Sequence, residues 1–389
     1  MTLSTIRLGE LMLRRGGSVD PAKHKDEEFD LYSIPAFDKG ASELVMGRDI
    51  GSSKQQLEQN DILLSKIVPH IRRAWVVGAP RGRRQIGSGE WIVFRSKAIN
   101  SRYLSHVLVG DPFHKAFMQT VSGVGGSLLR ARPAQVAEIQ IPLPPLDEQK
   151  RIAAILDAAD ALRAKRRQSI AQLDALIQST FLDLFGDPVT NPMGWPMVTI
   201  GDLLTSTSYG TSKKAHETDG AYPCLRMNNI TYAGGWDFSS LKYVNLESKE
   251  IPKYLVHKGQ LLFNRTNSKE LVGKTAVYRG QNPMAYAGYL VRGIVNEVVA
   301  TADFISTFLN LPQGKAILMG MCKNIVGMAN INAQEFKTIQ IPKPPLPLQQ
   351  KFAAIVESIE RQKNTQRAHL TELDALFAAL QHRAFRGEL

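Results

Sequence analysis

The feature that most constrains this chain is an internal repeat at a constant offset of 200 residues. The stretch 139–185 begins with Ile-Gln-Ile-Pro-Leu-Pro-Pro-Leu, and the stretch 339–385 begins with Ile-Gln-Ile-Pro-Lys-Pro-Pro-Leu. Without any gap, 17 of the 47 aligned positions are identical. A repeat of this length predicts two copies of one structural unit within the chain.

Each copy predicts one long helix, over residues 147–185 and 347–385. The prolines keep the residues before each helix extended, and Pro347 suits a first helical position. Gly186 and Gly387 are expected to form left-handed caps at the two C-terminal ends. At 1.5 Å per residue, each helix is about 58 Å long.

Apolar residues recur at spacings of three and four along both helices, which predicts a coiled-coil seam. We expect the helices to pair antiparallel, with Ile152 or Leu156 near Phe377 or Leu380. The alternative is two amphipathic helices, each packed on its own domain. The residues expected to pair the helices are Ile152, Leu156, Ile170, Leu173, Ile177, Phe352, Val356, Leu370, Leu373 and Phe377.

The middle of this seam is polar in both copies. Arg163 and Arg166 of the first helix are expected opposite Lys363 and Gln366 of the second. No acidic counterpart for these cations is evident. Polar positions of this kind can set register and orientation at some cost in stability.

Similarity between the two halves extends beyond the helices. Residues 61–66 resemble 260–265, each a short strand followed by a cationic turn, and 91–94 match 289–292. Short strands separated by Gly, Pro and Asn turns dominate both halves. We therefore expect an α+β fold of two similar mixed α/β domains, separated by the long helices. The expected bounds are 1–138 for the first domain, 139–187 for the first helix, 188–338 for the second domain and 339–389 for the second helix.

Net charge and cysteine content indicate which type of partner and which cellular compartment to expect. The net charge of +12 favours a polyanionic partner. Cys224 and Cys322 lie far apart without metal-ligand spacing, which predicts a reduced, cytoplasmic environment. Residues 1–10 contain no apolar signal core, and no stretch reaches transmembrane length, so we expect no membrane association.

No motif for catalysis or metal binding is evident. Gly273-Lys274-Thr275 follows a strand, but Ser268 occupies the position of the first glycine in a phosphate-binding loop, so we expect a turn into a strand at 276–278. The eight histidines form neither a zinc spacing nor part of a nucleophile elbow. We therefore expect no catalytic residue, no metal site and no cofactor on this chain.

Cationic and amide side chains follow comparable strands in both halves. Arg and Asn hydrogen-bond the edges of guanine and adenine, whereas Lys mostly contacts phosphates, so these clusters predict DNA contact. In the first domain the candidates are Lys66, His70, Arg72, Arg73, Arg81, Arg83 and Arg84. In the second domain they are Lys213, Lys214, Arg226, Asn228, Asn229, Arg265, Asn267, Lys269 and Lys274.

The whole chain resembles the specificity (S) subunit of type I restriction-modification systems. The most specific parts are the Ile-Pro-x-Pro-Pro-Leu leads into Gln149 and Gln349, and the end of the second helix at 384–389. The segments that resemble target-recognition domains of this family are 64–73 in the first half, and 209–213, 225–230, 264–268 and 271–275 in the second.

The resemblance implies two target-recognition domains held apart by antiparallel helices, each reading one half of a split, asymmetric site in double-stranded DNA. It also implies two methyltransferase (M) subunits, which carry S-adenosylmethionine and methylate adenine, and motor-nuclease (R) subunits that cleave. Two alternatives stay open: a coiled-coil adaptor whose basic domains bind RNA or an acidic protein, and a free-standing DNA enzyme. Salt-dependent binding to one split duplex distinguishes the DNA-reading subunit from the adaptor.

Overall fold

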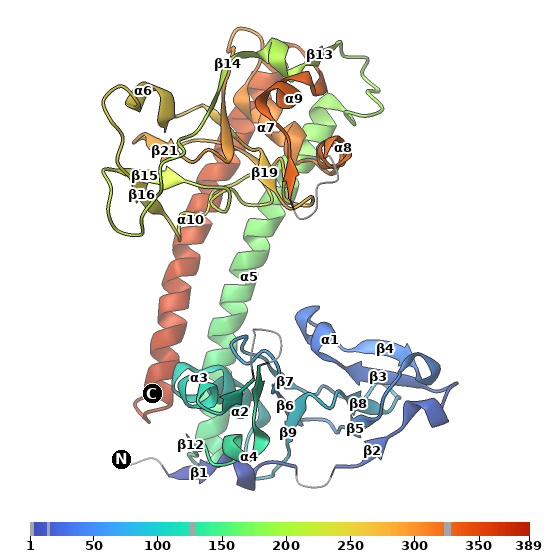
Figure 1. The fold of residues 1–389 in the computed structure, drawn as a ribbon. Helices are drawn as coiled ribbons and strands as arrows, with labels where there is room; N and C mark the ends of the chain where they lie inside the picture. Colours follow the sequence, from blue (N-terminus) through green and yellow to red (C-terminus); the bar gives the residue numbers. More distant parts are fainter. Residues whose placement is uncertain (1–3, 14–15, 124–128, 323–327) are drawn as a thin grey trace. The chain divides into compact units, whose positions relative to one another are not determined.

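The computed structural model describes residues 4–13, 16–123, 129–322 and 328–389. The chain divides into two compact units. Unit 1 comprises Met1–Arg166 and His369–Leu389, and unit 2 comprises Arg167–Ala368. Each unit combines one mixed α/β region with segments of both long helices, so the expected α+β class and internal repeat are confirmed (Figure 1).

Unit 1 contains two main sheets. One has the strand order β7-β6-β9, and the other has the order β2-β5-β8-β3-β4. β1 and β12 form a separate antiparallel pair, and β12 directly precedes the first long helix along the chain. The strands are β1 (Thr5–Arg7), β2 (Ser18–Val19), β3 (Glu28–Tyr32), β4 (Glu43–Met46), β5 (Lys54–Gln56), β6 (Ile62–Ser65), β7 (Ala74–Val76), β8 (Gln85–Gly87), β9 (Trp91–Phe94), β10 (Val121–Ser122), β11 (Arg130–Ala131) and β12 (Gln140–Pro142). The short helices are α1 (Ile34–Asp38), α2 (Ser101–Val109), α3 (Asp111–Met118) and α4 (Pro133–Val136).

Unit 2 repeats this plan with a different outer sheet. Its main sheet has the order β14-β22-β18-β20, and its outer sheet has the order β16-β15-β21-β17. The strands are β13 (Met197–Thr199), β14 (Leu204–Tyr209), β15 (Tyr222–Leu225), β16 (Lys242–Val244), β17 (Leu255–Val256), β18 (Leu261–Asn264), β19 (Thr266–Asn267), β20 (Thr275–Val277), β21 (Met284–Tyr286), β22 (Leu290–Val295), β23 (Ala329–Asn330) and β24 (Gln340–Pro342). The short helices are α6 (Ile251–Tyr254), α7 (Ala302–Asn310), α8 (Pro312–Met321) and α9 (Ala333–Thr338).

The shared part of the two units is the part nearest the long helices. The antiparallel pair β6–β9 corresponds to β18–β22, and β1–β12 corresponds to β13–β24. The outer sheets differ in strand number and order. The two units therefore share the strands that pack near the long helices and differ in their outer sheets. This arrangement is that of one scaffold presenting two different surfaces.

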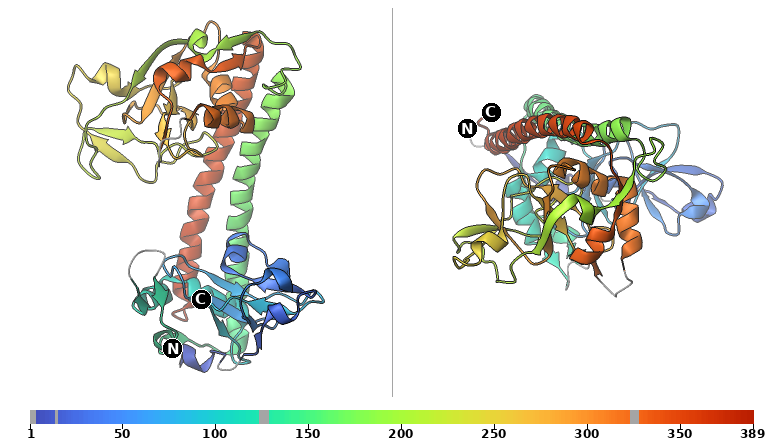
Figure 2. Two further views of the ribbon diagram at one scale, coloured as in Figure 1. Left: turned by 45° about the vertical axis from the view of Figure 1, so that its right-hand side comes forward. Right: turned by 90° about the horizontal axis from the view of Figure 1, so that it is seen from above.

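The long helices are α5 (Leu146–Phe185) and α10 (Leu346–Ala384). Both begin within a residue of the expected positions. Gly186 and Gly387 have φ of +79° and +74°, so the expected left-handed conformation after each helix is confirmed. Within each unit, segments of the two helices run side by side in all views (Figure 2).

The helices pair antiparallel in each unit. In unit 1, Ile152 and Leu156 from the start of α5 share a buried cluster with Phe377 from the end of α10. In unit 2, Phe352 and Val356 from the start of α10 share a cluster that Ile177 of α5 also contacts. This confirms the expected orientation. Ile170, Leu173, Leu370 and Leu373 are only half-buried, so the middle of the helices is less tightly covered than their ends.

The polar middle of the seam does have acidic partners, contrary to the expectation. In unit 1 the Arg163 guanidinium pairs with Asp374 at 2.6 Å. In unit 2 the Lys363 ammonium pairs with Asp174 at 2.6 Å and with Glu360 at 2.5 Å. Asp174 and Asp374 belong to the repeated Leu-Asp-Ala-Leu sequence, so the pairs Arg163–Asp374 and Lys363–Asp174 are related by the 200-residue offset. Reciprocal pairs of this kind specify the antiparallel register.

A repeated glutamine joins each long helix to its α/β region. The Gln149 side chain accepts from the Asn100 N–H and donates to the carbonyls of Ala98 and Pro144. Gln349 accepts from the Thr301 N–H and donates to the Pro344 carbonyl. Both glutamines are at most 1% exposed. Only an amide both donates and accepts in this way, which explains the glutamine in both copies.

Candidate nucleic-acid interface

Unit 2 contains a groove that is lined mainly by cationic and neutral polar residues. Its volume is about 570 Å³. Five of its lining residues are cations, and no carboxylate lines it among the described residues. The lining residues are Thr211, Ser212, Lys213, Lys214, Ala215, Arg226, Lys242, Arg265, Thr266, Ala287, Gly288, Tyr289 and Asn330. A groove with this composition suits a polyanion.

Close backbone packing shapes one wall of the groove. The segment after β14 lies against the turn between β21 and β22, where the Thr211 N–H donates to the Tyr286 carbonyl and the Gly288 N–H donates to the Thr211 carbonyl. A Cβ at Gly210 would lie 2.2 Å from the Tyr286 carbonyl oxygen, so only glycine fits there. This packing places the side chains of 211–215 beside those of 287–289.

The two arginines of the groove keep donors without partners. Arg226 donates from Nη2 to the Ser240 carbonyl, but its Nε is buried and has no acceptor. Arg265 lies with its guanidinium 4.9 Å from the centre of the Tyr209 ring, and its Nε is likewise buried without an acceptor. Buried donors without acceptors are costly, and they favour a ligand that supplies acceptors.

The lysines of the groove have different surroundings. Lys213 pairs with Glu250 at 2.5 Å, and this hydrogen bond raises the pKa of the Lys213 ammonium. Lys242 pairs with Glu217 at 2.7 Å. Lys214 is exposed. Lysine side chains of this kind mostly contact phosphates when they bind DNA.

Two predicted contact residues support the loop that carries Arg226 instead of lining the groove. Asn229 is 1% exposed; it accepts from the Arg226 N–H and donates to the Asp237 carbonyl. The buried Lys274 ammonium donates to the carbonyls of Met227 and Ile230, and burial lowers the pKa of Lys274. Gly273 has φ of +81°, and β20 begins at Thr275, so the expected turn into a strand is confirmed.

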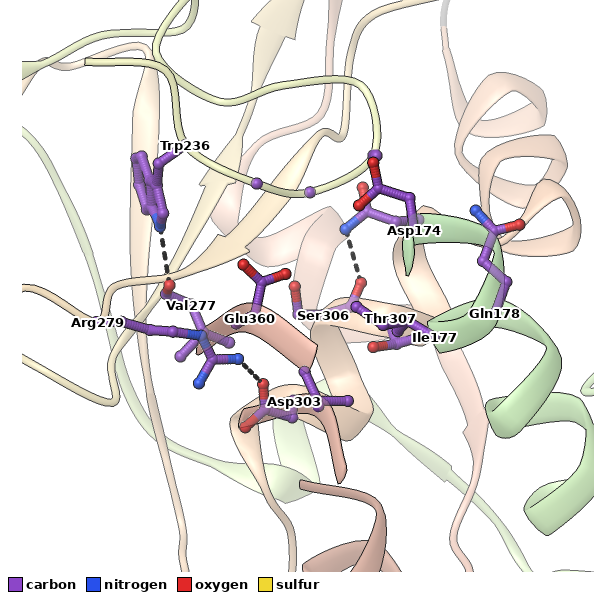
Figure 3. Close-up of a pocket in the computed structure, with 15 residues that line it drawn as sticks. Asp174, Ile177, Gln178, Trp236, Val277, Arg279, Asp303, Ser306, Thr307 and Glu360 are labelled. Atoms are coloured by element: carbon purple, nitrogen blue, oxygen red, sulfur yellow. Dashed lines mark hydrogen bonds and ion pairs between the residues drawn. The ribbon is translucent and has the colours of Figure 1, made fainter. Parts of the chain in front are cut away.

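A small polar cavity of about 60 Å³ lies beneath this loop, where it meets segments of the long helices within unit 2 (Figure 3). Trp236 donates from its indole to the Val277 carbonyl, and Arg279 pairs with Asp303. Burial of the Asp303 carboxyl raises its pKa. Glu360 of α10 lines the same cavity. The segment 233–236, which follows the Arg226 loop, therefore lines one cavity together with residues of α7 and α10.

The other second-domain candidates lie outside the groove lining. Asn228 and Lys269 are exposed, and the half-buried Asn267 accepts from the Ser268 N–H. DNA contact by these residues stays a prediction. Tyr209, Lys242, Tyr289 and Asn330 were not among the predicted DNA-contact residues, although Tyr209 begins the segment 209–213 that resembles a target-recognition domain. The groove lining and the Tyr209–Arg265 contact depend on chain pairings, such as β19 with β23, that no local motif reveals.

In unit 1, three predicted arginines form a ladder of ion pairs. Arg81 pairs with Asp30, Arg83 with Glu28, and Arg84 with Glu27. The parallel pairing of β3 with β8 brings the two segments together. The hydrogen bond from Arg84 holds the pKa of Glu27 below its usual value. These arginine side chains are 38–48% exposed, so they can still contact phosphates.

The remaining unit 1 candidates are also mostly engaged. Arg73 is 7% exposed and makes a two-pronged pair with Asp38, which lowers the pKa of that carboxyl. Arg72 donates to the Val109 carbonyl and pairs with Asp111 at 2.6 Å. Lys66 donates to the Gly89 carbonyl, and His70 is exposed. DNA contact by these side chains stays a prediction.

Comparison with known proteins identifies the family. The family model described as the type I restriction modification DNA specificity domain matches residues 5–174 and 192–374, which is more than half of the chain. The chain belongs to this family. Its two matched regions correspond to the two halves of the internal repeat.

Curated members of the specificity family are more distant in sequence. The type I restriction enzyme EcoKI specificity subunit of Escherichia coli (strain K12) is 25% identical over 316 residues, which covers 75% of this chain and 66% of that protein. The StySPI specificity subunit of Salmonella potsdam is 25% identical over 313 residues, with the same two coverages. The chain therefore spans just under two thirds of the length of these relatives.

Solved structures of type I systems share the fold. The S subunit from M. genitalium has a TM-score of 0.54 at 11% identity, covering 98% of this chain and 96% of that one. A chain from a study of complex assembly and conformational transition of a type I restriction-modification system has a TM-score of 0.53 at 19% identity, covering 100% and 98%. At these identities the likeness establishes the fold alone.

Within the described residues, no helix is both long and apolar enough to span a membrane. The same residues contain no group of three or more His, Cys, Asp or Glu side chains suited to a metal ion.

Proposed function

We propose that this chain is the DNA sequence-specificity subunit of a type I restriction-modification complex. In this proposal the target-recognition domain at 1–138 reads one half of a split DNA site, and the domain at 188–338 reads the other half. The long helices at 139–187 and 339–389 act as the spacer. Because the outer sheets of the two units differ, the two half-sites differ and the target is asymmetric.

The observation that carries the proposal is the groove of unit 2. Five cations line it, and two of these, Arg226 and Arg265, have a buried and unpaired Nε donor. In a protein of this family, double-stranded DNA supplies both the phosphates and the base-edge acceptors that such a groove lacks. We place Lys213, Lys214, Arg226 and Arg265 at the DNA face, and we leave the buried Asn229 and Lys274 out of it.

For the first domain we propose a face built on the arginine ladder. Arg81, Arg83 and Arg84 are held in a row by their carboxylate partners and remain partly exposed. Because their carboxylate partners hold these arginines in place and partly neutralise them, we expect them to position the DNA phosphate backbone and to add little to the binding affinity. Arg73 is left out because its guanidinium is buried against Asp38.

The proposal assigns the chemistry to partner subunits. Two methyltransferase subunits carry S-adenosylmethionine and methylate adenine, and motor-nuclease subunits cleave. The chain supplies binding and spacing only, and the complex works in the cytoplasm. Accordingly, the purified chain should not methylate DNA, and methyl transfer should appear when a methyltransferase subunit with its cofactor is added.

Equilibrium binding tests this function. The complex of the chain with its methyltransferase subunits should bind one split duplex far more tightly than duplexes in which either half-site is scrambled, and affinity should fall steeply with salt. Equal binding to all duplexes, or a preference for RNA or an acidic protein, would support the adaptor alternative. Methyl transfer by the chain alone would contradict the division of labour.

A further inference from the structure

We infer that Arg265 is the residue of the second domain that reads a guanine, and that Tyr209 holds it in position to do so. This inference rests on the proposed function, and it adds the identity of one base and of the side chain that selects it. The evidence is the contrast between how firmly Arg265 is held and how few of its donors are satisfied.

The backbone of Arg265 is fixed on both sides. Its N–H donates to the Tyr289 carbonyl at 3.0 Å, and its carbonyl accepts from the Ile331 N–H at 2.9 Å. Directly after it, β19 pairs with β23, with Thr266 opposite Asn330. The side chain therefore leaves a rigid point where three segments of unit 2 meet.

The guanidinium is oriented by an aromatic ring. It lies 4.9 Å from the centre of the Tyr209 ring, and the Tyr209 hydroxyl accepts from the Ala333 N–H at 3.0 Å. The ring is thus anchored at the start of α9. Stacking fixes the face of a guanidinium and leaves the donors along its edge available for an acceptor in its plane.

Those donors have no acceptor within the described part of the chain. The Nε of Arg265 is buried and unpaired, and no carboxylate of the described residues forms an ion pair with it. Arg226 and Arg292 also have a buried, unpaired Nε, but each donates from another guanidinium nitrogen, to the Ser240 and Leu255 carbonyls respectively. Arg279 pairs with Asp303.

The fork of an arginine fits two acceptors best, and in DNA these are the N7 and O6 atoms of guanine or the oxygens of a phosphate. The surroundings favour guanine. Thr266 and Asn330, which are neutral and suited to base edges, line the groove beside Arg265, while Lys213, Lys214 and Lys242 provide phosphate contacts elsewhere in the groove. A rigid, stacked side chain suits the fixed geometry of a base edge.

The test replaces guanines of the second half-site, on either strand, one at a time with 7-deazaguanine, which lacks the N7 acceptor. The protein is the full chain in complex with its methyltransferase subunits. At one guanine the wild type should lose about 2- to 12-fold in affinity, because 7-deazaguanine keeps O6 and removes one of the two hydrogen bonds of an arginine–guanine pair. Arg265→Ala and Arg265→Lys should both lose sensitivity at that guanine and keep it at the others.

Two further variants define the roles. Tyr209→Leu should reduce the discrimination at the same guanine, and Tyr209→Phe, which keeps the ring, should restore most of it. Lys214→Gln should weaken binding to all duplexes alike and keep the full sensitivity to 7-deazaguanine. Because Arg265→Lys and Tyr209→Phe change little volume, their discrimination ratios remain measurable even if an alanine variant unfolds.

The outcomes separate the inference from the proposed function. If the wild type binds a split site but Arg265→Ala and Arg265→Lys keep their sensitivity at every guanine, Arg265 does not read guanine. If the alanine variant weakens all duplexes equally, Arg265 is a phosphate contact. A second half-site without guanine also overturns the inference. A wild-type complex without any sequence preference overturns the proposed function together with it.

Discussion

At the scale of single residues, the most informative contacts are the two ion pairs of the helix seam. Lys363 is 1% exposed, and its ammonium lies between Asp174 and Glu360. The equivalent Arg163 is more accessible; it pairs with Asp374 and lies over the Phe377 ring. A buried charge is destabilising when it loses its partner, whereas a more exposed charge is solvated by water. Removing one partner should therefore cost more folding free energy at Lys363 than at Arg163.

Asp174→Ala should lower the free energy of unfolding of unit 2 by about 2–4 kcal/mol, because it leaves a buried ammonium with one partner fewer. Asp374→Ala should cost about 1 kcal/mol, because Arg163 is closer to solvent. Urea unfolding followed by tryptophan fluorescence measures both. Lys363→Met in the Asp174→Ala background should regain part of the loss. If Asp174→Ala and Asp374→Ala lowered the free energy of unfolding equally, burial of Lys363 would not determine the strength of its ion pair.

Lys315 provides a pH-dependent test. Burial, with a smaller effect from Lys274, lowers the pKa of Lys315 from 10.5 to about 8. The unfolded chain then binds more protons than the folded chain between those values, so stability from this group rises as pH increases from about 8 to 10.5. Relative to Lys315→Met, the unfolding midpoint of the wild type should rise across this window. The exposed Lys249→Met provides the control, and a constant difference across the window would refute the shift.

At the scale of secondary-structure elements, each long helix is attached to its α/β region by a buried glutamine. The side chains of Gln149 and Gln349 accept hydrogen bonds from the backbone N–H groups of Asn100 and Thr301. These two residues are also the N-caps of the short helices α2 and α7. The start of a long helix and the start of a short one are thereby locked together. This contact explains why proline-led glutamine segments recur in both halves.

Gln349→Glu should destabilise unit 2 by about 2 kcal/mol or more, because a carboxylate cannot donate to the Pro344 carbonyl and would be buried. The matched control is Gln350→Glu, which makes the same chemical change at the adjacent, exposed position. Thermal unfolding compares the two variants. A similar melting temperature for both would show that the glutamine contact contributes little.

The sequence was most informative where the signal is local. The helix bounds, the glycine caps and the turn at Gly273 depend on neighbouring residues, and they were predicted correctly. The acidic partners of Arg163 and Lys363 were missed because the register of an antiparallel pair is a non-local property. Likewise, the arginine ladder depends on the pairing of β3 with β8, and the contact between Tyr209 and Arg265 depends on three-dimensional packing.

At the scale of the whole molecule, we propose that the long helices act as the spacer between the two target-recognition domains. Half-sites read by such domains are expected about one helical turn apart, roughly 10–11 base pairs between centres. The bases between the half-sites then go unread. Spacer length and base preference should therefore be separable properties.

Lengthening both helices by four residues tests this separation. The insertions belong between Arg163 and Asp174 and between Lys363 and Asp374, so that each ion pair stays within its unit. The added rise of about 6 Å should shift the preferred gap by one or two base pairs and leave the recognised bases unchanged. Methylation of targets whose gap varies one base pair at a time measures the optimum. An unchanged optimum would mean that another feature sets the spacing.

The proposed role as a DNA sequence-specificity subunit is tested most directly by mapping methylated adenines in DNA from cells that carry this chain and its methyltransferase partner. We expect one asymmetric motif made of two different half-sites around an unread gap. We also expect substitutions in the groove of unit 2 to alter one half of the motif only. A palindromic or continuous motif, a change in both halves from groove substitutions, or methylation that does not depend on this chain would contradict the proposed function.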